Sequence, residues 1–314
     1  MNPSALLTVG QTALELGLIC SLTVLALFLS YSMLNVCDLS TDGCFTLGAA
    51  VGAMVAVAGY PLLSIPAAML AGVASGFVTA LLQTKFGIDS LLAGIIVNTG
   101  LYSVNMAVMA GSALVNLNKK DTIFTMVKDL LAGTPLAGQQ NIVVAAIAVI
   151  LAVAFLTIFL NTRLGLAIRA TGNNPDMVRS SSINPAFTTI VGLCVANAFT
   201  GLSGCLMAQS QKQAEINIGT GMVTIALASL LIGSTLMGRG SIFTRAVGMV
   251  AGAFIFRLVY AIALRLDILP AFMLKLISAV IVALSIALPH LKQQWPIIYR
   301  RLSYRQAAAG KGGD

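Results

Sequence analysis

The residues most able to carry out chemistry are few in this sequence and stand far apart. His290 is the one histidine, and the five cysteines form no C-x-x-C pair, so no metal-ligand cluster is predicted. The chain contains no phosphate-binding G-x-x-x-x-G-K-[ST] loop. The sequence therefore predicts no catalytic residue, no metal and no cofactor bound by the chain itself.

Polar residues that interrupt apolar segments are the next candidates for function. Asp38, Ser40 and Thr41 lie between two long apolar runs. Carboxylates are costly in hydrocarbon, and non-helical backbone is tolerated there only beside protein or a water-filled cavity. The interpretation as part of a translocation pathway stands beside a simpler one. In that reading, the segment is an ordinary turn in which Ser40, Thr41 and Asp42 cap a helix that starts near Cys44.

A second polar group has helical spacing. Asn98, Thr99, Tyr102 and Asn105 are separated by steps that place them on about one face of a helix. Such a face can line a pathway, or it can form hydrogen bonds with neighbouring helices. Glu15 and Arg257 are also candidates, because they are ionisable residues within apolar segments. They could pair with each other, or the arginine could bind a carboxylate.

The loop 161–185 is the longest polar segment on its side of the predicted bundle. Arg163–Ala170 and Asp176–Ser182 are each predicted to form a short helix, with a turn over Thr171–Pro175 between them. The loop can be a solvated basic connection or a docking element for a partner.

The elements that must position these residues are membrane-spanning helices. Hydrophobic residues make up 58% of the 314 residues and charged residues only 9%, against about 25% charged in a soluble domain. The apolar runs have helical length and lack the alternation of a transmembrane barrel. The predicted fold is all-α, a polytopic bundle of about nine spans (eight to ten), at 5–34, 43–60, 62–83, 90–111, 141–160, 187–208, 222–237, 246–265 and 270–290. Residues 1–291 would form one transmembrane domain, and 292–314 a basic tail.

The distribution of basic residues predicts the orientation. Alternate loops and the tail carry eleven lysines and arginines, and the loops on the other side carry five. The more basic side is expected to be cytoplasmic. The C-terminus would then be inside and the N-terminus outside, and the formal charge of +8 reflects membrane topology and not a nucleic-acid partner. Three G-x-x-x-G motifs, which begin at Gly48, Gly72 and Gly248, predict close helix packing within the bundle.

The loop also resembles a known family. Its sequence T-R-L-G-L-A-I-R-A-T-G-N-N-P (162–175), followed by S-x-I-N (181–184), is similar to the cytoplasmic coupling loop of the permeases of branched-chain amino acid, ribose and related ABC importers. Asp38-Leu39-Ser40 and Gly238-Arg239-Gly240-Ser241 resemble further segments of that family. The resemblance implies that eleven residues couple the permease to its ATPase: Arg163, Gly165, Arg169, Ala170, Gly172, Asn173, Pro175, Asp176, Ser181, Ile183 and Asn184.

The resemblance further implies a type II importer fold in the bacterial cytoplasmic membrane. The expected partners are two cytoplasmic ATPases that bind ATP and Mg²⁺, a second permease copy in a homodimer, and an extracytoplasmic binding protein or lipoprotein. The outer segments 116–140 and 209–220 would face that binding protein. The expected solute is a hydrophobic or aromatic amino acid, with a sugar or nucleoside as the alternative. A self-sufficient secondary transporter and a membrane-embedded enzyme are the rivals from other classes, and neither needs an ATPase-docking loop.

Overall fold

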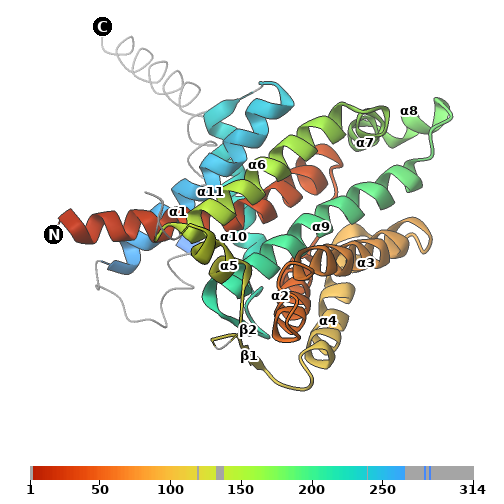
Figure 1. Ribbon diagram of the computed structural model, residues 1–314. Coiled ribbons are helices and arrows are strands. Elements are labelled where there is room, and N and C mark those ends of the chain that lie inside the picture. Colours follow the sequence, from red (N-terminus) through yellow and green to blue (C-terminus); the bar gives the residue numbers. More distant parts are fainter. Residues whose placement is uncertain are drawn as a thin grey trace, which may run out of the picture.

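The computed structural model describes residues 3–118, 120–131, 138–238 and 240–265, together with 279, 280 and 283. Within these residues the chain is predominantly helical (Figure 1), which confirms the predicted all-α polytopic bundle. The ninth predicted span, 270–290, lies almost wholly outside the described residues, and the tail 292–314 lies entirely outside them.

Six helices of the described part are long and apolar enough to cross a membrane. They are α1 (Pro3–Leu27) with its π-helical continuation η1 (Phe28–Met33), α3 (Ser64–Thr84), α4 (Ser90–Val108), α6 (Gln140–Asn161), α9 (Pro185–Gln211) and α11 (Ile242–Arg265). Two shorter apolar helices, α2 (Thr41–Val57) and α10 (Met222–Met237), correspond to two further predicted spans. Each of the first eight predicted spans is therefore an apolar helix.

The helix α9 forms the centre of the bundle. It makes extensive contacts with α2, α3 and α1, while α11 packs on α1 and α10. The predicted G-x-x-x-G motifs account for these contacts. A Cβ at Gly48 would collide with the backbone of Gly201 in α9, and a Cβ at Gly72 with that of Asn197. The third motif, in α11, packs in the same way on α10. The motifs thus hold helices together within one chain, backbone against backbone.

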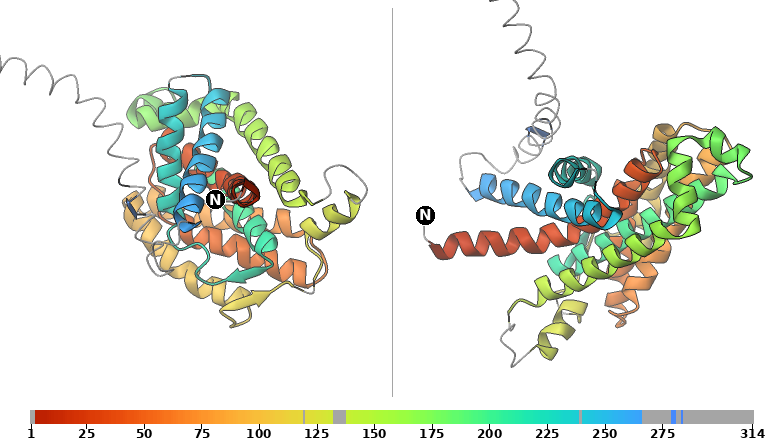
Figure 2. Two further views of the ribbon diagram at one scale, coloured as in Figure 1. Left: turned by 90° about the vertical axis from the view of Figure 1, so that its left-hand side faces the viewer. Right: turned by 90° about the horizontal axis from the view of Figure 1, so that it is seen from above.

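The two ends of the bundle carry different small elements (Figure 1). At one end, α7 (Arg163–Asn173) and α8 (Pro175–Ser180) connect α6 to α9. At the other end lie α5 (Ile123–Leu130) and the strands β1 (Leu114–Asn116) and β2 (Gln213–Glu215), which pair in antiparallel register. The N-terminal part of α1 projects from the bundle (Figure 2). We refer to the two ends as the hairpin end and the sheet end.

The shorter helices α2 and α10 both begin inside the bundle. After η1 the chain turns back at Asn35, which has a positive φ of 57°, and runs without helix to Ser40. There Asp38 reaches Asn197, which lies about midway along α9. Likewise, the chain that follows β2 runs back to a glycine turn beside α2, and α10 begins there. The N-termini of these two shorter helices therefore meet in the interior of the bundle.

Candidate functional site

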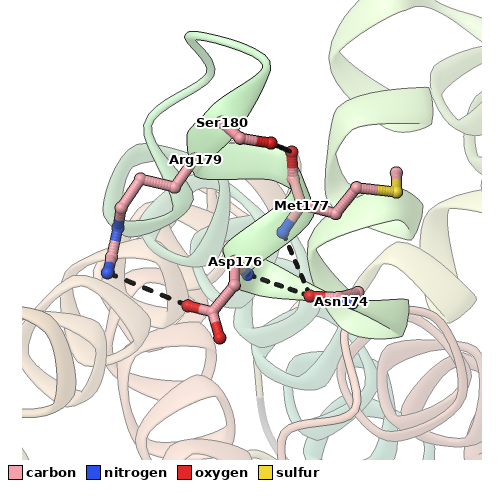
Figure 3. Close-up of polar contacts among 5 residues, drawn as sticks. All are labelled: Asn174, Asp176, Met177, Arg179 and Ser180. Atoms are coloured by element: carbon pink, nitrogen blue, oxygen red, sulfur yellow. Dashed lines mark hydrogen bonds and ion pairs between the residues drawn. The ribbon is translucent and has the colours of Figure 1, made fainter.

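The α7–α8 hairpin is fixed by side chains that cap its own helices (Figure 3). Thr162 caps α7 by accepting a hydrogen bond from the Gly165 backbone N–H. Asn174 caps α8, and its Oδ1 accepts from the N–H groups of Asp176 and Met177 at 3.1 Å each. Pro175 occupies the first turn of α8, where its missing N–H is not needed. The break between the helices thus follows from local sequence.

The first helix of the hairpin is longer than the sequence predicted. It continues through Asn173, whereas a turn was expected from Thr171 onwards. Thr171 lies within this helix, where its Oγ1 bonds the Ala167 carbonyl at 2.8 Å and the Thr188 hydroxyl of α9 at 2.8 Å, which ties α7 to α9. At the other boundary, Ser181 and Ser182 form a turn and are not part of α8. The predicted pair of short helices is present, with the break shifted to Asn174.

Small residues seat α7 against the membrane helices. A Cβ at Gly165 would collide with the Phe159 carbonyl of α6, and one at Gly172 with the Met33 carbonyl at the end of η1. Ile168 between them is fully buried. These contacts connect α7 rigidly to α6 and to the end of the first span.

The helix α8, in contrast, presents nearly all of its side chains to solvent. Met177 is 57% exposed, and only Val178 is buried among its six residues. Met177 and Val178 were not among the predicted coupling residues, although an apolar pair within a polar loop could have indicated them. Of the eleven predicted coupling residues, seven are exposed, three are half-buried and one, Gly165, is buried. The exposed residues are Arg163, Asn173, Pro175, Asp176, Ser181, Ile183 and Asn184. Asn184 also caps α9 through the Ala186 N–H.

The turn before α2 is a buried hydrogen-bonded junction. The Asp38 carboxylate accepts from the Ser40 N–H (2.8 Å), from the Ser40 hydroxyl (2.6 Å) and from the Asn197 amide of α9 (2.7 Å). Thr41 donates to the Asp38 carbonyl, and Thr79 of α3 donates to the Ser40 hydroxyl. Asp38, Ser40 and Thr41 are each at most 2% exposed. The structure therefore places these three pathway candidates in a packed polar core.

The carboxylate of Asp42 caps a helix other than its own. Its two oxygens accept from the Gly221 N–H at 2.9 Å and the Val223 N–H at 2.8 Å, at the start of α10. The predicted capping of α2 is wrong in this respect, because Ser40 occupies the N-cap position without a side-chain cap hydrogen bond. The carboxylate lies beside the positive ends of two helix dipoles, α2 and α10, which favour its charged form, while its burial opposes that form.

A cavity of about 400 Å³ opens beside this junction. Its walls come from α2, from α4 and from the chain between β2 and α10, and they contain Asp42, Gly43, Thr46, Asn98, Thr99, Tyr102, Ser103, Asn105, Ile216, Asn217 and Thr220. The predicted polar face of α4 thus lines one cavity. Asn217 and Thr220 were missed, since nothing in the sequence indicates that a loop so distant in the chain returns to α4.

Glu15 and Arg257 lie apart from this cavity. Glu15 accepts hydrogen bonds from Asn141 at 2.8 Å and Ser210 at 2.6 Å, near the sheet end. Arg257 donates to the Cys20 sulfur at 2.8 Å. The structure does not bring the two residues together as an ion pair, and neither contributes to the cavity wall.

The two loops at the sheet end form one continuous surface. The pairing of β1 with β2 joins the segment after α4 to the segment after α9. Gln209 of α9 extends this connection, because its Oε1 accepts from the Ile123 N–H at the start of α5, at 2.9 Å. The described parts of two segments that sequence analysis treated separately are therefore joined at the sheet end.

The described residues form a bundle of apolar helices, with an exposed helical hairpin at one end and a polar cavity beside two interior helix ends. These features are typical of a membrane transport subunit. Residues 11–288 match the family described as branched-chain amino acid transport system / permease component. The tyrosine transport system permease protein of Clostridioides difficile (strain R20291) is 32% identical over 86% of this chain and 88% of its own length. The ribose import permease protein RbsC of Escherichia coli (strain K12) is 27% identical over 82% and 78%. No solved structure matches the chain significantly.

The chain belongs to this family. It is a multi-pass membrane protein and the permease component of an ABC transport system. The family assignment implies an ATPase and a substrate-binding protein as partners. A permease component is a transport subunit, and both relatives above are named for transport.

Proposed function

We propose that this chain forms the solute pathway of an importer in the bacterial cytoplasmic membrane and is driven by ATPases that dock on α8. The observation that carries the proposal is the contrast within the hairpin. The first helix, α7, is seated on α6 and η1 through Gly165 and Gly172, whereas α8 exposes nearly every side chain. A push on α8 would therefore be passed to the spans through α7. On this reading the hairpin end and the C-terminus are cytoplasmic, and the N-terminus and sheet end are outside.

The cavity beside Asp42 is proposed as a section of the solute pathway. Polar groups exposed at the depth of a membrane span are costly against lipid, so they face water or protein. Tyr102 is 52% exposed on α4, and Thr99 and Ser103 beside it are exposed as well. A second copy of the chain, placed against this face of α4, would enclose the cavity. The surface of α5, β1 and β2 would receive the binding protein.

The proposed solute is an aromatic or other hydrophobic amino acid. The relative named for tyrosine transport supports this choice, because it is more similar to the chain than the relative named for ribose import. A sugar is the alternative, and the ribose permease supports it. In either case the binding protein would share in the selection of the solute.

Docking on α8 can be tested by its effect on ATPase binding. The substitution Met177→Glu places a charge on the exposed apolar side chain of α8. We expect it to reduce co-purification of the partner ATPase at least about tenfold, as loss of a central apolar anchor would. ATP-driven uptake by the reconstituted transporter should fall with it.

The matched control is Met126→Glu, the same substitution on α5 at the sheet end, where Met126 is 38% exposed. This variant should retain ATPase co-purification. Equal ATPase binding by Met177→Glu and the unaltered chain would refute docking on α8. The isolated chain should hydrolyse no ATP, and sustained hydrolysis without a second protein would contradict the transport-subunit assignment.

A further inference from the structure

The oxygen atoms around the cavity form a site with an excess of hydrogen-bond acceptors. Asp42 is half-buried in the wall and carries a formal negative charge. Its two hydrogen bonds come from backbone N–H groups, which are neutral, so they orient the carboxylate without cancelling its charge. None of the cavity-lining residues carries a positive charge.

Asn105 provides an acceptor that has no partner. Its side chain is 2% exposed and lies in the cavity wall. Its Nδ2 donates to the Gly43 carbonyl at 3.1 Å, which fixes the orientation of the amide, and the Oδ1 is left without a hydrogen bond. A buried acceptor of this kind is costly unless a ligand or water supplies a donor.

Asn98 adds a third oxygen on the same side. Its Oδ1 lies so close to Gly43 that a Cβ built on that glycine would be 2.7 Å from it. Gly43 directly follows Asp42 and also receives the Asn105 hydrogen bond, so all three side chains gather around the first turn of α2. A larger residue at position 43 would displace the Asn98 side chain from this arrangement.

We propose that this group of acceptors binds the ammonium group of the solute as it passes through the cavity. The inference rests on the proposed function, because it assumes that the solute enters this cavity. An ammonium group offers three donors and a positive charge, which suits the Asp42 carboxylate and the Asn98 amide oxygen in the cavity wall, with the buried Asn105 amide fixing the first turn of α2 beside them. A solute with a carboxylate alone would bring a second negative charge beside Asp42, and a sugar would bring no cation to pair with it. The site therefore selects amine-bearing solutes.

The test compares three small molecules that share a phenyl ring and differ in their charged groups. Phenylalanine has an ammonium and a carboxylate, phenethylamine has the ammonium alone, and 3-phenylpropionate has the carboxylate alone. Binding of each is measured on the full chain in lipid nanodiscs, without the binding protein, so that only the permease selects. We expect 3-phenylpropionate to bind about tenfold or more weakly than the other two, the size expected for one partly desolvated charge interaction.

The substitution Asp42→Asn should bring the three affinities to within about twofold of one another, because the amide keeps the shape and removes the charge. The matched control is Asp89→Asn. Asp89 also caps a helix, α4, through the Leu91 N–H, but it lies outside the cavity. This control should preserve the preference of the unaltered chain. The three probes can also be compared on the unaltered chain alone, so the test holds even if a variant fails to fold.

Equal binding of 3-phenylpropionate and phenylalanine by the unaltered chain would overturn the inference. Absence of binding by all three probes would overturn it as well, as would an unchanged preference in a folded Asp42→Asn variant. Failure of the proposed function has a separate signature. In that case the transporter reconstituted with its ATPase and binding protein would show no ATP-driven uptake of any solute.

Discussion

Two of the connections between helices, the α7–α8 hairpin and the junction before α2, differ in what holds them. In the hairpin, Thr162 and Asn174 bond backbone groups within three positions of themselves. In the junction, Asp38 bonds Asn197, and Asp42 bonds Gly221 in a helix far along the chain. The capping bonds of the hairpin are therefore local, whereas those of the junction form only when the helices assemble. The exposed hairpin, with its local bonds, suits contact with a partner that binds and releases. The buried junction, with its long-range bonds, suits a fixed core.

The largest expected effect comes from breaking the junction. The substitution Asp38→Ala removes the acceptor for three hydrogen bonds and leaves the Ser40 N–H and the Asn197 amide in a buried site. We expect a loss of about 3 kcal/mol in the free energy of unfolding, because buried donors are left unsatisfied. Denaturant titration of the purified chain in detergent micelles measures the change. Asp38→Asn, which keeps one acceptor oxygen, should lose clearly less, and a loss below about 1 kcal/mol for the alanine variant would contradict this reading.

A smaller effect is expected where the hairpin meets the bundle. Leucine at Gly172 would overlap the Met33 carbonyl and lift α7 from the end of η1. We expect a loss of about 2 kcal/mol from overpacking, with membrane insertion retained and ATP-driven uptake abolished. The control is Gly10→Leu, at a glycine where a Cβ meets nothing within 4 Å. If the Gly172→Leu variant took up solute as fast as the control, the contact of α7 with the end of η1 would not transmit motion.

The smallest effect is expected on the exposed surface of α8. Asp176 and Arg179 form an ion pair at 3.9 Å, with side chains 90% and 74% exposed. Solvent screens such a pair, so Asp176→Asn should change the free energy of unfolding by less than about 0.5 kcal/mol. The same titration provides the measurement. A change comparable to that of Asp38→Ala would remove the distinction between the two regions.

Sequence analysis was accurate for features that depend on local residues and missed those that depend on distant ones. Apolar run length located eight helices, and the predicted span 222–237 coincides with α10. Local capping signals predicted two helices in the hairpin. The helical spacing of Asn98 and Asn105 placed them on one face, and both line the cavity. These features depend on residues close together in the chain, so the sequence alone was sufficient.

Long-range partners were not predictable from one sequence. The carboxylate of Asp42 was assigned to its own helix, yet its hydrogen-bond donors are Gly221 and Val223 at the start of α10. The strands β1 and β2 have three residues each, too few for a periodic pattern. The placement of Asp38 in a packed core depends on Asn197, which no local signal connects to it.

The helix α9 is held by hydrogen bonds near both of its ends. Near its start Thr188 bonds Thr171 of the hairpin, and near its end Gln209 bonds the backbone of Ile123 at the sheet end. Its 27 residues make a rod of about 40 Å. Its middle packs through glycine contacts against α2 and α3. One continuous helix therefore joins the hairpin to the sheet end, so the two ends of the bundle are connected through α9.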